Sequence, residues 1–268
     1  MRLWMILVAI LASPAVSAAE TTWQTLSPAL KARIISADSL GPDGRLLIGL
    51  DLALAPGART YWRIAGAAGL ATHLDFSGSD GIGATEIVWP QPQVLIEEGL
   101  LEYVYTSATL LPIWVELPHG RATLSIAYTG GVCTDICMPL SGAFTLAVGD
   151  AVPDRASAVH LAQALATTPI AWDQATPPLR LEGCETPPGT VTLSVLDPTL
   201  DATSVILTGD RADVLYLPES AAADTAPSDR LVFERIPQSS PVERNLTASF
   251  STPAGPYALR LRCASTAK

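Results

Sequence analysis

Residues 122–148 read ATLSIAYTGGVCTDICMPLSGAFTLAV, and large side chains occupy every second position from Leu124 to Tyr128. A period of two is what a half-buried β-strand requires, because successive side chains of a strand point to opposite faces of its sheet. The pair Gly130-Gly131 then allows the backbone to turn tightly. This stretch therefore predicts two strands, Ala122–Tyr128 and Ala143–Val148, with a cysteine-bearing loop between them.

The rest of the chain also has the sequence pattern of short β-strands separated by turns. The sequence contains 19 Gly and 22 Pro, and runs rich in β-branched and aromatic residues lie between these turn-forming residues. Apolar residues make up 49% of the chain and charged residues 16%, so a large core can form and disorder is not expected. Further strands are expected at Ala32–Ala37, Arg45–Leu54, Thr85–Trp89, Leu101–Ser107, Thr109–Leu117, Thr190–Leu196, Ser204–Thr208, Val214–Leu217, Arg230–Arg235, Asn245–Ser251 and Tyr257–Arg262.

One segment has a helical pattern. Asp154 to Leu165 is Ala-rich, with apolar residues near helical spacing, a Pro-Asp pair at its start and a Thr-Pro pair after its end. We assign this helix to a linker at residues 151–178, between a first domain at 19–150 and a second at 179–268. The sequence thus predicts an all-β protein of two immunoglobulin-like antiparallel β-sandwich domains joined by a short helical linker.

The first 18 residues have the pattern of a secretory signal peptide. Arg2 supplies a positive charge, Leu3–Ala12 form a short apolar run, and small residues up to Ala18 offer a cleavage site. The apolar run is far shorter than the roughly 20 residues that a membrane-spanning helix needs. We therefore expect residues 1–18 to be cleaved on export to the periplasm, and no segment to insert into a membrane.

The net charge of the chain indicates which classes of binding partner it does not suit. The formal net charge is −10, from 16 basic and 26 acidic side chains, so nucleic acid and anionic lipid surfaces are poor candidates. His73, His119 and His160 are scattered without metal-site spacing, and neither a phosphate loop nor a nucleophile elbow is present. The sequence gives no support for a nucleotide-binding or hydrolytic function.

Four cysteines in an exported chain make disulfide bonds the default expectation. Cys184 and Cys263 lie near the two ends of the second expected domain. A bridge between them would close a long loop and stabilise the fold by roughly 4 kcal/mol in the chain-entropy model. We therefore predict that Cys184 and Cys263 form a structural disulfide.

The other two cysteines, Cys133 and Cys137, are separated by only Thr134-Asp135-Ile136. A ring this small gains little loop-closure entropy, so it stabilises a fold weakly. A short disulfide on a loop is more easily reduced, which suits thiol–disulfide exchange. The spacing alone leaves two interpretations open, a redox-active pair and a local disulfide that staples a hairpin.

Several segments around this pair resemble a known family. In order and spacing they resemble the N-terminal periplasmic domain of the DsbD/ScsB-type thiol:disulfide interchange proteins, above all in a Tyr-x-Trp-Arg element and a Cys-x-Asp-Ile-Cys-x-Pro element. The resemblance covers roughly Trp23 to Asp150, and the close spacing of the cysteines is nearer to the ScsB-like branch. The segments that carry it are Tyr61-Trp62-Arg63-Ile64-Ala65-Gly66, Trp89-Pro90-Gln91-Pro92, Leu111-Pro112-Ile113, and Ala127-Tyr128 leading to Val132-Cys133-Thr134-Asp135-Ile136-Cys137-Met138-Pro139.

The resemblance implies an immunoglobulin-like sandwich whose cysteine pair relays electrons to or from periplasmic thioredoxin-fold proteins, without a cofactor. It implies that Cys137 forms the mixed disulfide with the partner and that Cys133 is the resolving thiol. The sequence ends at Lys268 with neither the transmembrane segment nor the C-terminal thioredoxin-like domain of full-length members, so a stand-alone protein with a separate membrane electron donor is expected. The direction of electron flow stays open.

Two alternatives remain. Cys133, Cys137 and Met138 form a set of soft sulfur ligands that could hold Cu(I), as in a periplasmic copper-binding or copper-tolerance protein. If both disulfides are staples, the chain would instead be a non-catalytic interaction module. Trp62 and Trp89 could form a substrate platform or cover the disulfide, although tryptophans in such strands are more often part of the core.

Overall fold

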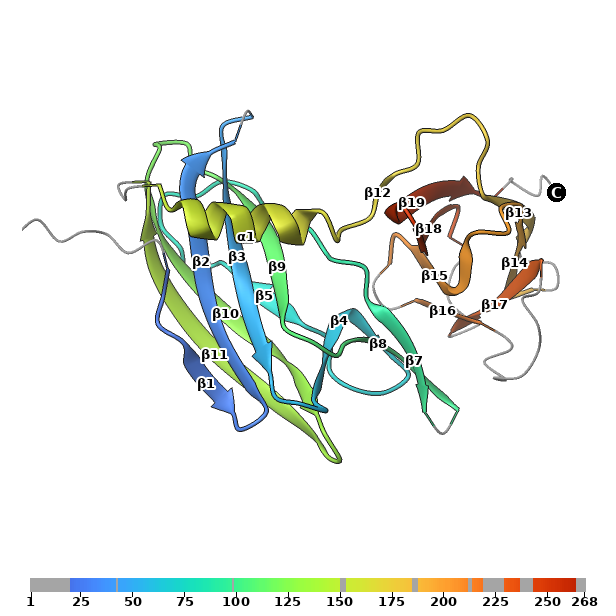
Figure 1. Cartoon of the computed structure of the whole chain (residues 1–268), viewed down its shortest axis with the longest axis horizontal. Helices are drawn as coiled ribbons and strands as arrows, with labels where there is room; N and C mark the ends of the chain where they lie inside the picture. The colour runs from blue at the N-terminus through green and yellow to red at the C-terminus, as the bar shows by residue number, and fades with distance from the viewer. Residues whose placement is uncertain are drawn as a thin grey trace, which may run out of the picture.

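A computed structural model describes residues 20–41, 43–97, 99–149, 153–184, 188–211, 214–218, 229–236 and 243–263. Residues 1–18, which we expect to form a signal peptide, lie outside these ranges. Figure 1 shows two β-rich bodies next to each other, with the helix α1 lying along the first of them. Among the described residues, no helix is long and apolar enough to span a lipid bilayer.

The first body consists of two sheets that share one apolar core. Residues of both sheets, such as Ile34, Leu50 and Tyr128, belong to a single buried cluster, so the two sheets form the antiparallel sandwich that the sequence predicts. The first sheet has the order β1 (Gln24–Ser27), β2 (Leu30–Leu40), β3 (Arg45–Leu54), β9 (Thr109–Glu116) and β6 (Thr85–Ile87). The second has the order β11 (Cys137–Val148), β10 (Ala122–Cys133), β4 (Arg59–Gly66), β8 (Leu100–Tyr105) and β7 (Gln93–Glu97), and β5 (His73–Asp75) also pairs with β10.

The hairpin of β10 and β11 is longer than the sequence pattern predicts. The strands were expected to end at Tyr128 and to resume at Ala143, but their pairing continues through Gly130 and Gly131 up to the two cysteines. The two glycines are needed for close approach and not for a turn. A Cβ atom on Gly130 would lie 2.6 Å from the Tyr128 hydroxyl oxygen, and one on Gly131 would lie 3.1 Å from Cβ of Leu70.

The helix α1 (Arg155–Leu165) packs on the outer face of the first sheet. Asp154 is its N-cap, and the carboxylate of Asp154 accepts hydrogen bonds from the amides of Ala156 and Ser157. Leu161 is fully buried in a cluster with Ile35 of β2 and Leu110 of β9. The predicted linker helix therefore also covers part of the first domain.

The second body is one curled sheet. Its described strands lie in the order β12 (Ile170–Ala171), β19 (Gly255–Arg262), β18 (Asn245–Thr252), β15 (Asp201–Gly209), β16 (Leu215–Pro218), β17 (Arg230–Ile236), β14 (Thr190–Val195) and β13 (Leu179–Cys184), all antiparallel except the β12–β19 pair. The sheet curls so that its last strand, β13, comes next to β19, where Cys184 in β13 is bonded to Cys263 just after β19, with a Cα–Cα distance of 5.7 Å. The curled sheet encloses a second apolar core around Leu193, Leu207 and Phe250.

The two bodies are in direct contact, through β7 and β8 of the first and β15 and β16 of the second. Ile206 of β15 is fully buried and belongs to the core cluster of the first body. The Tyr103 hydroxyl donates to the carbonyl oxygen of Tyr216 at 3.5 Å, and the side-chain amide of Gln91 donates to the carbonyl oxygen of Ser204 at 3.1 Å. The second body is therefore packed against the first and not merely tethered to it.

Candidate functional site

The tip of the β10–β11 hairpin carries a disulfide bond between Cys133 and Cys137. Cys133 is the last residue of β10 and Cys137 is the first of β11, and the two residues lie directly opposite each other. Their Cα atoms are 4.0 Å apart, close to the separation of directly opposed residues in an antiparallel pair. Regular strand pairing therefore brings the two sulfurs within bonding distance, and only Thr134–Ile136 form the turn.

The two cysteines differ sharply in exposure. Cys133 is 0% exposed and packs in a small buried cluster with Tyr61, Ala65 and Val104. Cys137 is exposed, and Ile136 beside it is 73% exposed. Cys137 is therefore the cysteine that faces an approaching protein, whereas Cys133 is enclosed.

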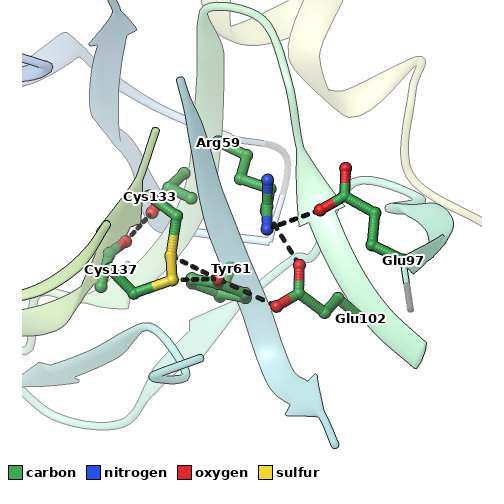
Figure 2. The surroundings of a disulfide bond; sticks show 8 residues. Arg59, Tyr61, Glu97, Glu102, Cys133 and Cys137 are labelled. Carbon is green, nitrogen blue, oxygen red and sulfur yellow. Dashed lines mark hydrogen bonds and ion pairs between the residues drawn. A yellow bond between two sulfur atoms is a disulfide. The ribbon is translucent and has the colours of Figure 1, made fainter. Parts of the chain in front are cut away.

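A buried tyrosine hydroxyl lies against the disulfide. The Oη atom of Tyr61 is 2.7 Å from Sγ of Cys133 and 3.5 Å from Sγ of Cys137. The same hydroxyl donates to Oε1 of Glu102 at 3.2 Å, so it stands between the sulfurs and a carboxylate (Figure 2). Burial raises the pKa of Tyr61, and the negative charge of Glu102 raises it further. Tyr61 is therefore a neutral hydroxyl throughout the physiological pH range.

The Glu102 carboxylate is buried, 4% exposed, and an arginine compensates its charge. Nε of Arg59 lies 2.8 Å from Oε2 of Glu102, an ion pair without the alignment of a hydrogen bond. Nη2 of Arg59 lies 3.0 Å from Oε2 of the exposed Glu97. Burial disfavours the charge of Arg59, but Tyr61 and the two carboxylates outweigh it and raise the pKa of Arg59. Figure 2 shows the resulting row of side chains, from the disulfide through Tyr61 to Glu102 and Arg59.

The position of Tyr61 is fixed by its strand and by the turn that follows it. Strand β4 lies next to β10, where the hydroxyl of Thr60 donates to the carbonyl oxygen of Gly131 at 2.8 Å. Gly69 has a φ of +88°, and a Cβ atom there would lie 2.2 Å from the Tyr61 ring. Only glycine permits both this backbone conformation and this close approach. The turn after β4 therefore covers the tyrosine next to the disulfide.

The other residues singled out in the sequence lie elsewhere. Trp62 is buried and packs edge-on against Tyr103, and Trp89 is partly buried against the same core, so neither forms an exposed platform. Met138 follows Cys137 in strand β11, so its side chain leaves the opposite face of the sheet. The structure therefore does not gather the three sulfurs of the Cu(I) alternative. In the described part of the chain, no group of three or more His, Cys, Asp or Glu side chains could hold a metal ion.

Sequence reasoning assigns no role to Tyr61 and misses Arg59 and Glu102. Glu102 left one signal in the sequence, because it is the only charged residue in the otherwise apolar or aromatic run Leu100–Tyr105. A carboxylate buried in such a run needs a partner that compensates its charge, and this requirement indicates a polar site inside the protein.

Comparison with known proteins agrees with this geometry. Residues 26–148 match the family model described as thiol:disulfide interchange protein DsbD, N-terminal. The fold is similar to the crystal structure of the N-terminal periplasmic domain of ScsB from Proteus mirabilis, with a TM-score of 0.69 and 18% sequence identity. This similarity covers 91% of the present chain and 98% of the other, so it extends over both β-rich bodies. No curated protein matches the chain in sequence.

Proposed function

Because residues 26–148 form a domain of the DsbD N-terminal family of thiol:disulfide interchange proteins, we propose that this chain is a periplasmic thiol–disulfide exchange protein whose redox centre is the Cys133/Cys137 pair. The observation that carries the proposal is the contrast in exposure between the two cysteines. A relay disulfide needs one sulfur that a partner can attack and a second that stays enclosed until it resolves the intermediate. Cys137 is exposed and Cys133 is fully buried, which fits these two roles.

The exchange takes place in two displacements. In the direction that reduces the partner, the Cys137 thiolate attacks the partner's disulfide, a Cys137–partner bond forms, and the partner's other sulfur leaves as a thiolate. Cys133 then attacks the sulfur of Cys137, the Cys133–Cys137 bond forms, and the second partner sulfur leaves. Two electrons pass to the partner and the protein's dithiol becomes a disulfide. The reverse sequence oxidises the partner, and neither direction requires a metal or an organic cofactor.

The partners that this site suits are periplasmic thioredoxin-fold proteins, with a separate membrane protein as the electron donor. Ile136 and Met138 are exposed apolar residues on either side of Cys137. Exposed apolar side chains around a reactive sulfur are typical of a surface that docks another protein. Asp135 lies between the two cysteines and adds a negative charge. This charge favours a partner whose docking surface has a basic or neutral edge.

Single cysteine variants test this function. Cys133→Ser should trap a mixed disulfide between Cys137 and a thioredoxin-fold partner, because the resolving thiol is gone. Cys137→Ser should abolish exchange, and the double substitution of Cys184 and Cys263 serves as the control that leaves the pair at the hairpin tip intact. Normal exchange by both single variants would show that the pair is only a staple, as the interaction-module alternative holds.

A second measurement separates the remaining alternatives. Thiol trapping in glutathione buffers should show that the Cys133–Cys137 bond is reduced without unfolding, at a potential above the roughly −300 mV of structural disulfides. Titration of Cu(I) into the reduced protein should show binding through no more than the two thiols, since Met138 points away from them. Tight Cu(I) binding together with slow exchange would favour the copper-binding alternative.

A further inference from the structure

The buried position of Cys133 creates a requirement for a proton acceptor. In the resolving step the Cys133 thiol must lose its proton before its sulfur can attack Cys137. Water does not reach Cys133, which is 0% exposed, and an apolar environment disfavours a thiolate. A group inside the protein must therefore accept the proton at the moment of attack.

Tyr61 is placed to accept this proton on its oxygen. Its Oη atom lies closer to Sγ of Cys133, at 2.7 Å, than to Sγ of Cys137, at 3.5 Å. A tyrosine hydroxyl has one proton to donate, and a hydrogen bond to a carboxylate is roughly twice as strong as one to a neutral acceptor. The Tyr61 proton therefore points to Oε1 of Glu102, and the lone pairs of its oxygen face the sulfurs.

Glu102 is the base at the end of this short chain. It is nearly buried, and Arg59 pairs with the carboxylate oxygen that does not accept from Tyr61, Oε2. Because the pKa of Tyr61 is raised by burial, the hydroxyl does not hold a negative charge of its own and only passes protons on. The row from sulfur to hydroxyl to carboxylate is continuous in Figure 2.

We propose that Tyr61 and Glu102 form a proton relay for Cys133 in the resolving step, an inference that rests on the proposed function. As the sulfur of Cys133 bonds to the sulfur of Cys137, its proton moves to the Tyr61 oxygen and the Tyr61 proton moves to Glu102. The sulfur–sulfur bond to the partner breaks, and the partner's sulfur leaves with the electron pair. In the opposite direction Glu102 returns the proton, through Tyr61, to the departing sulfur of Cys133. Tyr61 thus acts as a catalytic residue, and Glu102 acts through it.

The test follows the two displacements separately with a small reagent. The reduced protein is mixed with dithiobis(nitrobenzoate), which releases one coloured thiolate when Cys137 attacks it and a second when Cys133 resolves the mixed disulfide. Glu102→Gln, which keeps the shape of the side chain, and Tyr61→Phe should slow the second release by about 10²-fold, the lower range for general base catalysis. The first release should stay unchanged. The second release should depend more steeply on pH in both variants than in the wild type.

Glu97→Gln is the matched control, because Glu97 pairs with the same arginine but is exposed and does not touch Tyr61. It should leave both releases at the rates of the wild type. If both site variants keep the rate and the pH profile of the second release, the relay is refuted while the exchange function stands. If both releases slow equally, the substitutions disturb the whole site and the relay is likewise refuted. A pair that cannot be reduced without unfolding, or a Cys137 that gives no first release, would refute the exchange function itself.

Discussion

The two disulfides of this protein should contribute very differently to its stability. In the chain-entropy model, the stabilisation by a disulfide grows with the logarithm of the length of the closed loop. The sequence separations are 79 for Cys184–Cys263 and 4 for Cys133–Cys137, which correspond to about 4.5 and about 2 kcal/mol at 25 °C. Loss of the long-range bridge should therefore lower the free energy of unfolding by about 2.5 kcal/mol more than loss of the bridge at the hairpin tip.

Two double variants measure this difference. The variants are Cys133→Ala/Cys137→Ala and Cys184→Ala/Cys263→Ala, each of which removes one buried and one more accessible cysteine. In urea, with a slope of about 2.5 kcal/mol/M, the second variant should unfold about 1 M earlier than the first. Equal midpoints, or a larger loss from the pair at the hairpin tip, would refute the assignment of that pair to exchange chemistry and would mark it as a staple.

Two further predictions concern the surroundings of the site and the helix. Gly69→Ala forces a side chain into a positive-φ position against the Tyr61 ring, so it should cost about 1–3 kcal/mol in thermal unfolding and also slow the release of the second thiolate. A stable Gly69→Ala variant with normal exchange would show that this close approach does not hold Tyr61. The pKa of Asp154 is lowered by its hydrogen bonds to Ser157 and to the amide of Ala156. Its contribution to stability is therefore complete above the ordinary value of 3.8 and lost as the pH falls through the lower folded-state pKa, so Asp154→Ala should flatten the loss of stability in acid. An unchanged acid profile would argue against this role.

The alternation of apolar and polar residues predicts most of the strands, but this pattern is absent where a strand is covered on both faces. Strand β3 was expected with the bounds Arg45–Leu54 that the structure shows. Strand β4 was missed, because Thr60, Tyr61 and Trp62 are all buried and leave no pattern of period two. One face of β4 packs on the core, and the turn that contains Gly69 covers the other. Because β4 is covered on both faces, the polar side chains beside the disulfide are enclosed as well.

The candidate site, like the fold, could be predicted from the sequence only in part. The cysteine pair could be found from its spacing and from the family resemblance, because both are local features of the sequence. The contacts of Tyr61 with Glu102 and Cys133 depend on the neighbouring positions of β8, β4 and β10 in one sheet. A register between strands that are far apart in sequence cannot be inferred from the pattern within each strand, so no local signal could join these three residues.

The contact between the two bodies has a practical consequence for the choice of expression fragments. The family match ends at residue 148, before α1 and before Ile206. A fragment cut at that boundary would uncover the apolar face of β2 and β9 that Leu161 covers. It would also remove Ile206 from the core cluster that contains Tyr103, on the strand that carries Glu102. Such a fragment would be prone to aggregate, and weak activity in it would say little about the intact protein. Covalent capture of a partner on Cys137 is therefore best attempted with both bodies present.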